Sequence, residues 1–260
     1  MYDIHGITSD TFAQKQNWAT RIDARVKMVF VLLALVINLL SPTVYTPLAV
    51  AVFCLAILVF IGVQLKLLAI SLIIPLILAA TVVVVQMFFF GHSPLFTIHL
   101  WHFQLTGYQE GLTRGFLIMS RVIGGVSLIL FLSMSTPVNR LLTAARWFRL
   151  SPTFIELSLL VYRYIFVLLE EVISIRSAQR VRLGYSNWNQ SMKSLGTLGG
   201  SVIVRAYDRA ERVFDAMLVR GYTGENRITC YEKLCRTDYL AIAIFSAILV
   251  GLSFIGVFLK

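Results

Sequence analysis

Long apolar runs occupy most of the first half of the chain and return near its C-terminal end. Four of them meet or approach the roughly 20 residues that a helix needs to cross a bilayer core, and a fifth is apolar except for two arginines. The five runs are residues 26–41, 47–65, 67–90, 111–136 and 239–259. The pattern therefore predicts an all-α integral membrane protein with about five transmembrane helices.

Between residues 137 and 238 charged positions interrupt the apolar ones. This segment holds 15 of the 23 basic residues and nine of the 13 acidic residues, so we expect a water-facing module inserted before the last span. Apolar positions recurring at three and four residues are typical of amphipathic helices. The predicted domains are 1–136, an N-terminal segment with four spans; 137–238, a module with helices at about 138–149, 153–183 and 200–220; and 239–260, the last span.

Composition supports a membrane protein, and the distribution of charge predicts its orientation. With 58% apolar and 14% charged residues, the chain lacks the polar surface of an enzyme that works free in the cytosol. The net charge of +10 falls mainly on segments that five spans place on one side, which predicts a cytoplasmic N-terminus and module. The apolar run 154–169 is expected to lie along the inner membrane face, because another span would export the 11 basic residues from Arg176 to Arg236.

Two predicted helix ends in the module resemble each other. Ala178-Gln179-Arg180-Val181-Arg182-Leu183-Gly184-Tyr185 and Ala216-Met217-Leu218-Val219-Arg220-Gly221-Tyr222 each contain an alanine, then an arginine, then a glycine and a tyrosine. One interpretation is two ordinary C-terminal caps, in which glycine permits the left-handed exit and arginine complements the helix dipole. The other is a pair of arginines that insert into two similar acidic sockets on a partner. The candidate residues are Ala178, Arg180, Arg182, Gly184, Val219, Arg220 and Gly221.

On these motifs, and on Arg21-Ile22-Asp23-Ala24-Arg25-Val26-Lys27 before the first span, the chain resembles the T component of energy-coupling factor transporters, the EcfT and CbiQ group. The resemblance implies a multi-pass scaffold in the plasma membrane of a prokaryote, without catalytic residues or a cofactor of its own. Two CbiO-like ABC-type ATPases would bind ATP and Mg²⁺. A CbiM-like S component, with or without a CbiN-like small subunit, would bind the substrate. The first motif departs from the family pattern, since Leu183 separates Arg182 from Gly184, and Arg180 competes with Arg182 for the docking role.

The resemblance also implies a substrate and a surface for the S component. The cobalt-type first motif favours cobalt or nickel uptake, and vitamin uptake is the alternative. The S component would contact the run 154–169, which contains Arg163, and the stripe that includes Ile203, Tyr207 and Phe214. Periodicity alone indicates only an amphipathic helix, for which internal packing is the other interpretation.

Arg121 lies about seven residues deeper than Arg114 in its apolar run, or roughly 10 Å further along a helix. A charge at that depth is costly and is normally paired, and the adjacent Gly124 and Gly125 permit a close approach of another helix. Arg121 is expected either to bond carbonyl groups inside the bundle or to contact the S component. A function of another class, a self-sufficient secondary transporter with Arg121 in its pathway, remains an alternative.

Other chemistry has little support in the sequence. His92, His99 and His102 share the outer loop, but the only acid near them is the distant Glu110, so a metal site there is a weak hypothesis. The chain has no GxxxxGK[ST] loop and no HExxH or GxSxG motif. The basic residues do not alternate with exposed aromatic ones, so nucleic acid is not an expected partner.

Overall fold

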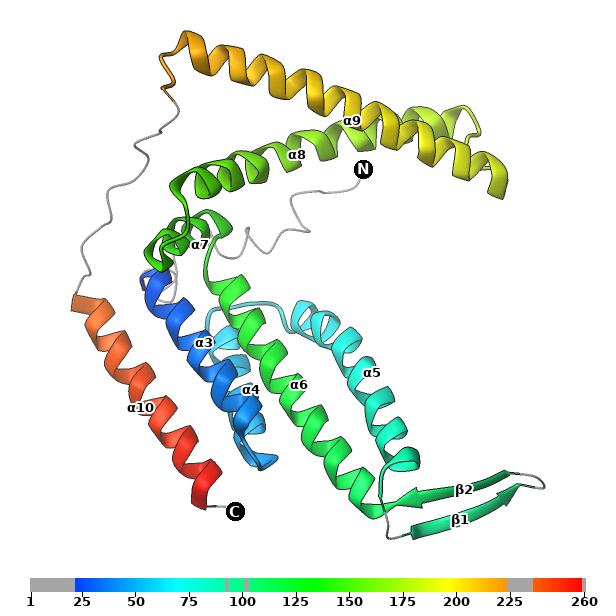
Figure 1. Cartoon of the computed structure of the whole chain (residues 1–260), viewed down its shortest axis with the longest axis vertical. Helices are drawn as coiled ribbons and strands as arrows, with labels where there is room; N and C mark the ends of the chain where they lie inside the picture. The colour runs from blue at the N-terminus through cyan, green and yellow to red at the C-terminus, as the bar shows by residue number, and fades with distance from the viewer. Residues whose placement is uncertain (1–21, 92–93, 101–102, 224–235, 259–260) are drawn as a thin grey trace. The chain divides into compact units, whose positions relative to one another are not determined.

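The computed structural model describes residues 22–91, 94–100, 103–223 and 236–258 (Figure 1). The chain forms two compact units. Unit 1 comprises Met1–Leu141 and Glu232–Lys260, and unit 2 comprises Leu142–Tyr231. The predicted module boundaries, after residues 136 and 238, both fall inside unit 1.

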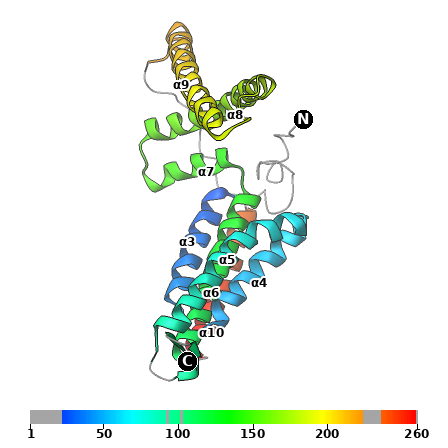
Figure 2. The same ribbon diagram turned by 90° about the vertical axis from the view of Figure 1, so that its right-hand side faces the viewer.

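Unit 1 is a bundle of helices with one β-hairpin (Figures 1 and 2). Its helices are α3 (Ala24–Leu40), α4 (Tyr45–Phe60), α5 (Leu65–Phe89), α6 (Gln109–Ser135) and α10 (Arg236–Phe258). Helix α6 packs against α3, α4 and α5, while α10 packs against α3 and α4. Each of the five predicted apolar runs therefore overlaps one of these helices.

Two helices in the described part of the chain, α5 and α6, are long and apolar enough to cross a membrane. They contain 25 and 27 residues, so they extend for about 38 and 40 Å at 1.5 Å per residue. Only Leu68 and Ala79 are buried along α5, whereas Ile74 and Leu78 are 76% and 67% exposed. Such an apolar surface is suited to lipid rather than to water.

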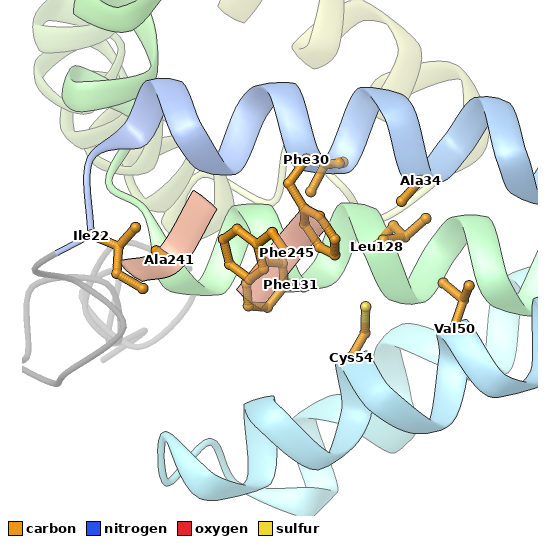
Figure 3. Packing of buried hydrophobic residues seen from close by; sticks show 10 residues of the cluster. Ile22, Phe30, Ala34, Val50, Cys54, Leu128, Phe131, Ala241 and Phe245 are labelled. Carbon is orange, nitrogen blue, oxygen red and sulfur yellow. The ribbon is translucent and has the colours of Figure 1, made fainter. Parts of the chain in front are cut away.

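The core of unit 1 joins four helices around Phe30 of α3 (Figure 3). The ring of Phe30 stacks on Phe245 of α10 at a centroid distance of 4.2 Å and meets Phe131 of α6 edge-on at 6.4 Å. Val50 and Cys54 of α4 complete the cluster on its other side. This packing links the last helix of the chain to the first described one.

A β-hairpin between α5 and α6 is an unpredicted addition to an otherwise helical unit. Strands β1 (Pro94–Leu100) and β2 (Phe103–Tyr108) are antiparallel, and Leu100 pairs with Phe103 nearest the turn. Apolar and polar residues alternate along β1, and a period of two is typical of a strand. The segment between α5 and α6 therefore contains regular structure.

Unit 2 is dominated by two long helices that lie against each other, α8 (Pro152–Val181) and α9 (Trp188–Val219). Before them come α7 (Val138–Ala145), in which the division between the units falls, and a 3₁₀ turn at Arg146–Phe148. Helix α9 begins at Trp188 rather than near residue 200 as predicted. The helix continues through the glycines at 196, 199 and 200, each of which costs a helix only about 1 kcal/mol relative to alanine.

Candidate functional site

The C-terminal ends of α8 and α9 have the same backbone conformation. Arg182 follows the last residue of α8 with φ −85° and ψ 14°, and Arg220 follows the last residue of α9 with φ −85° and ψ 8°. The next residue is left-handed in both cases, with φ 55° at Leu183 and φ 81° at Gly221. Both arginines are therefore held at the point where a helix ends and the chain reverses its twist.

The backbone hydrogen bonds of the two ends also match. At the first end the Leu183 N–H donates to the Arg180 carbonyl at 3.0 Å, and the Gly184 N–H donates to the Gln179 carbonyl at 2.9 Å. The second end repeats this pattern with two bonds. These run from Gly221 N–H to the Leu218 carbonyl at 2.9 Å and from Tyr222 N–H to the Met217 carbonyl at 3.0 Å. Each end is thus a Schellman motif, which satisfies carbonyl groups that a helix end leaves free.

This match aligns the two motifs residue by residue. Arg182 corresponds to Arg220, whereas Arg180 corresponds to Leu218 and has no basic counterpart. Three further pairs follow from the same alignment: Ala178 with Ala216, Val181 with Val219, and Leu183 with Gly221. Only Arg182 occupies the position of Arg220, and the docking role of either Arg180 or Arg182 stays a prediction.

Gly184 has a different role from the predicted one. The left-handed residue is Leu183, although that conformation costs a residue with a Cβ atom roughly 1–2 kcal/mol. Gly184 is required by crowding, because a Cβ atom there would lie 2.7 Å from Ser194 Oγ and 2.9 Å from the Gln179 carbonyl oxygen. At the second end, a Cβ atom built on Gly221 would meet nothing within 4 Å.

Both arginines are exposed, and each follows an exposed valine. Val181 is 84% exposed and Val219 is 89% exposed, so neither contributes to packing inside unit 2. Within the described part of the chain, no ion pair involves Arg182 or Arg220. Each helix end thus presents a valine and an unpaired guanidinium to its surroundings.

Side chains fasten the first end to the start of α9. Gln179 Nε2 donates to the Ser194 carbonyl at 2.9 Å and to Thr197 Oγ1 at 3.2 Å, and its Oε1 accepts the Tyr185 hydroxyl at 2.8 Å. Ser194 Oγ also donates to the Gly184 carbonyl at 2.8 Å. Gln179 could not be predicted as a site residue from the sequence, because two of its partners lie 15 and 18 residues further along, beyond any local pattern.

A groove of about 740 Å³ runs between α8 and α9. Four described residues were predicted to contact the S component here. Of these, Arg163 and Phe214 line the groove, whereas Ile203 and Tyr207 lie outside it and are each 71% exposed. No residue of α9 is buried, and Phe214 of its apolar stripe is 53% exposed. An ion pair of 3.2 Å between Arg209 of α9 and Glu171 of α8 ties the two helices together.

Arg121 bonds a carbonyl group inside unit 1. Its Nη2 donates to the Ser41 carbonyl at 2.7 Å, at the C-terminal end of α3, where a cation complements the helix dipole. Asn38 Nδ2 donates in turn to the Arg121 carbonyl at 2.9 Å. Gly124 permits this close approach, because a Cβ atom there would lie 2.6 Å from Asn38 Oδ1. The contact of Arg121 with an S component stays a prediction.

The predicted histidine set is only partly described. His99 lies in β1 opposite Gln104, whereas His92 and His102 lie outside the described residues. Because His99 is in a strand, a helical spacing with His102 does not apply. In the ranges that the structure describes, no group of three or more His, Cys, Asp or Glu residues could hold a metal ion.

Comparison with known proteins identifies relatives over most of the chain. The family CbiQ, described as cobalt transport protein, matches residues 15–230. An uncharacterized protein of Methanocaldococcus jannaschii is 32% identical over 92% of this chain and 90% of its own length. A putative fused cobalt transport protein CbiMQ of Methanocorpusculum labreanum is 32% identical over 89% of this chain and 39% of its own length. The cobalt transport protein CbiQ of Rhodobacter capsulatus is 35% identical over 37% of this chain and 40% of its own length. The family match includes both helix ends.

Proposed function

The chain belongs to the CbiQ family of cobalt transport proteins, and on that premise we propose that it is the transmembrane scaffold of an ATP-driven energy-coupling factor importer. It is a membrane-embedded transport component rather than an enzyme. Two ABC-type ATPase subunits hydrolyse ATP beside it, and a separate S component binds cobalt. The scaffold transmits the closure of the ATPase pair to that S component.

The matching ends of α8 and α9 carry this proposal. Arg182 and Arg220 occupy the same position of the same capping motif, and each follows an exposed valine. A guanidinium bonds a carboxylate through two parallel N–H groups, and the valine adds an apolar contact beside it. Two equal ends require two equal sockets, which a pair of identical or related ATPase subunits provides.

The groove between α8 and α9 supports the proposed contact with the S component. Its lining is mostly apolar, with Leu157, Leu160 and Val161 from α8 and Val213 and Met217 from α9. A membrane-embedded S component offers an apolar surface suited to such a groove. The name of the fused relative CbiMQ supports a CbiM-like protein as this partner and cobalt, rather than a vitamin, as the substrate.

The proposed topology has five spans, with the N-terminus and the module of residues 137–238 in the cytoplasm. In the part of the chain that the structure describes, α5 and α6 are long and apolar enough for a span, α10 has 23 residues, and α3 and α4 have 17 and 16. The distribution of basic residues supports the orientation, because the outer loop at 91–110 contains no lysine or arginine. Unit 2 then lies where an ATPase can reach it.

The test is charge reversal at the two ends, made in the full-length protein. Arg220→Glu and Arg182→Glu should each abolish cobalt uptake and weaken retention of the ATPase during purification in mild detergent on the order of 30-fold or more, through repulsion from an acidic socket. Arg180→Glu is the matched control, since Arg180 is an exposed arginine two residues before Arg182 and has no basic counterpart in α9.

Two results would overturn the proposal. One is a wild-type protein that purifies without an ATPase from native membranes and transports cobalt without ATP in liposomes. The other is an equal loss of ATPase from the Arg180→Glu and Arg182→Glu proteins, because the structural match gives only Arg182 the position of Arg220.

A further inference from the structure

Lys27 is a basic residue enclosed within unit 1. It lies in the first turn of α3 and is only 1% exposed. Its Nζ donates to the Ser135 carbonyl at 3.0 Å and to Thr136 Oγ1 at 3.2 Å. Ser135 is the last residue of α6, so the ammonium group sits at the end of that helix where free carbonyls favour a cation.

The same end of α3 also holds the start of α10. Asp238, in the first turn of α10, is 4% exposed, and its Oδ1 accepts a hydrogen bond of 2.9 Å from the Asp23 backbone N–H. The Asp23 side chain caps α3 by accepting the Arg25 N–H at 2.9 Å. The α3 N-terminus thus bonds the last turn of α6 and the first turn of α10.

These two attachments are where the chain leaves unit 1 and returns to it. After α6 ends at Ser135, the chain enters unit 2 at Leu142, and it comes back to unit 1 at Glu232, shortly before α10. On both sides of unit 2 the chain is therefore hydrogen-bonded to the start of α3. Ser135 and Thr136, before unit 2, bond Lys27, and Asp238, after it, bonds Asp23. The hydrophobic cluster around Phe30, which includes Ile22, Ala241 and Phe245, lies directly beside this point (Figure 3).

We propose that Lys27, with Asp23 and Asp238, is a positioning site that transmits movement of the coupling module to the membrane helices, an inference that rests on the proposed scaffold function. The physical reason is the cost of separation. If the end of α6 moved away from α3, the Lys27 ammonium would lose both acceptors in a site closed to water. Movement of the chain at the end of α6 or at the start of α10 therefore also moves the start of α3. These three helix ends move together. This inference gives residues 23–27, which lie outside the two capping motifs, a role in transport.

The test uses the complete transporter, purified with its ATPase and S component and reconstituted in liposomes. Lys27→Met keeps most of the side-chain volume and removes the charge and both hydrogen bonds. The protein should assemble and hydrolyse ATP as before, while the cobalt transported per ATP falls by roughly tenfold, the order expected for energetic coupling between two sites. Lys27→Arg, which retains the charge, should recover part of that ratio. Lys66→Met is the matched control, because Lys66 is an exposed lysine in the first turn of α5 and belongs to none of the contacts described above.

The outcomes separate this inference from the proposed function. An intact Lys27→Met complex with a normal ratio of transport to hydrolysis refutes the positioning role alone, and so does an equal effect of Lys66→Met. A wild-type protein without an ATPase refutes the scaffold. If Lys27→Met does not accumulate in the membrane, Thr136→Val decides the matter, because it removes one acceptor and leaves the Ser135 carbonyl in place. A lower transport ratio for that variant supports the inference, and an unchanged ratio overturns it.

Discussion

Gly184→Ala tests the packing of the capping motif at the C-terminal end of α8. The new Cβ atom would lie 2.7 Å from Ser194 Oγ and 2.9 Å from the Gln179 carbonyl oxygen, both closer than non-bonded atoms allow. Ser194 can rotate away, but it then loses its hydrogen bond of 2.8 Å to the Gly184 carbonyl. The Gln179 oxygen belongs to the backbone and accepts the Gly184 N–H in the capping motif, so the turn itself must shift.

We expect the substitution to destabilise the turn between α8 and α9 by about 2 kcal/mol, from the usual cost of overpacking together with one lost hydrogen bond. A change of that size raises the open population of the turn roughly 30-fold. Hydrogen exchange at amides 182–186, followed by mass spectrometry in detergent, measures the opening directly. Because the turn holds Arg182, retention of the ATPase should weaken in parallel.

Gly196→Ala is the matched control in the same pair of helices. A Cβ atom there meets nothing within 4 Å, and alanine favours a helix interior by roughly 0.5–1 kcal/mol over glycine. This variant should exchange more slowly in α9 and keep its ATPase. The reasoning fails if Gly184→Ala exchanges at the wild-type rate, or if both variants open the turn to the same extent.

Two further predictions concern unit 1. Arg121→Leu should lower the free energy of unfolding of the detergent-solubilised protein by about 1–3 kcal/mol, because the buried Ser41 carbonyl loses its donor. Thermal unfolding measures this loss. An unchanged unfolding temperature would show that this hydrogen bond does not stabilise unit 1. Gly124→Ala should cost about 1–3 kcal/mol by collision with Asn38, whose Oδ1 would lie 2.6 Å away, whereas Gly125→Ala, with its nearest neighbour at 3.7 Å, should be tolerated. Equal unfolding temperatures for the two glycine variants would contradict the packing of α3 against α6.

The helices of unit 1 were predictable because their signal is local. Runs such as 67–90 and 111–136 are apolar for more than 20 residues, and α5 and α6 occupy them to within two residues at each end. The charge contrast between 1–136 and 137–238 is equally local, since it needs only counting. The β-hairpin was missed because the search for long apolar runs passed over a short alternating segment.

The start of α9 was predicted wrongly. A helix was expected from about residue 200, but α9 begins at Trp188 and continues through the glycines at 196, 199 and 200. Packing of its N-terminal part against the end of α8, through Gln179 and Ser194, stabilises a segment that propensity alone disfavours.

The sequence by itself determined that the chain belongs in a membrane, that its charge gathers in one inserted segment, and that two helix ends carry arginine. Only the tertiary structure decided that Arg182 rather than Arg180 matches Arg220, that Arg121 bonds the Ser41 carbonyl, and that Lys27 is enclosed against Ser135. The last two contacts join residues 80 and 108 positions apart. Periodicity and composition describe neighbours along the chain, whereas such hydrogen bonds depend on which helices pack together and in which register, and that is set only when the whole bundle forms.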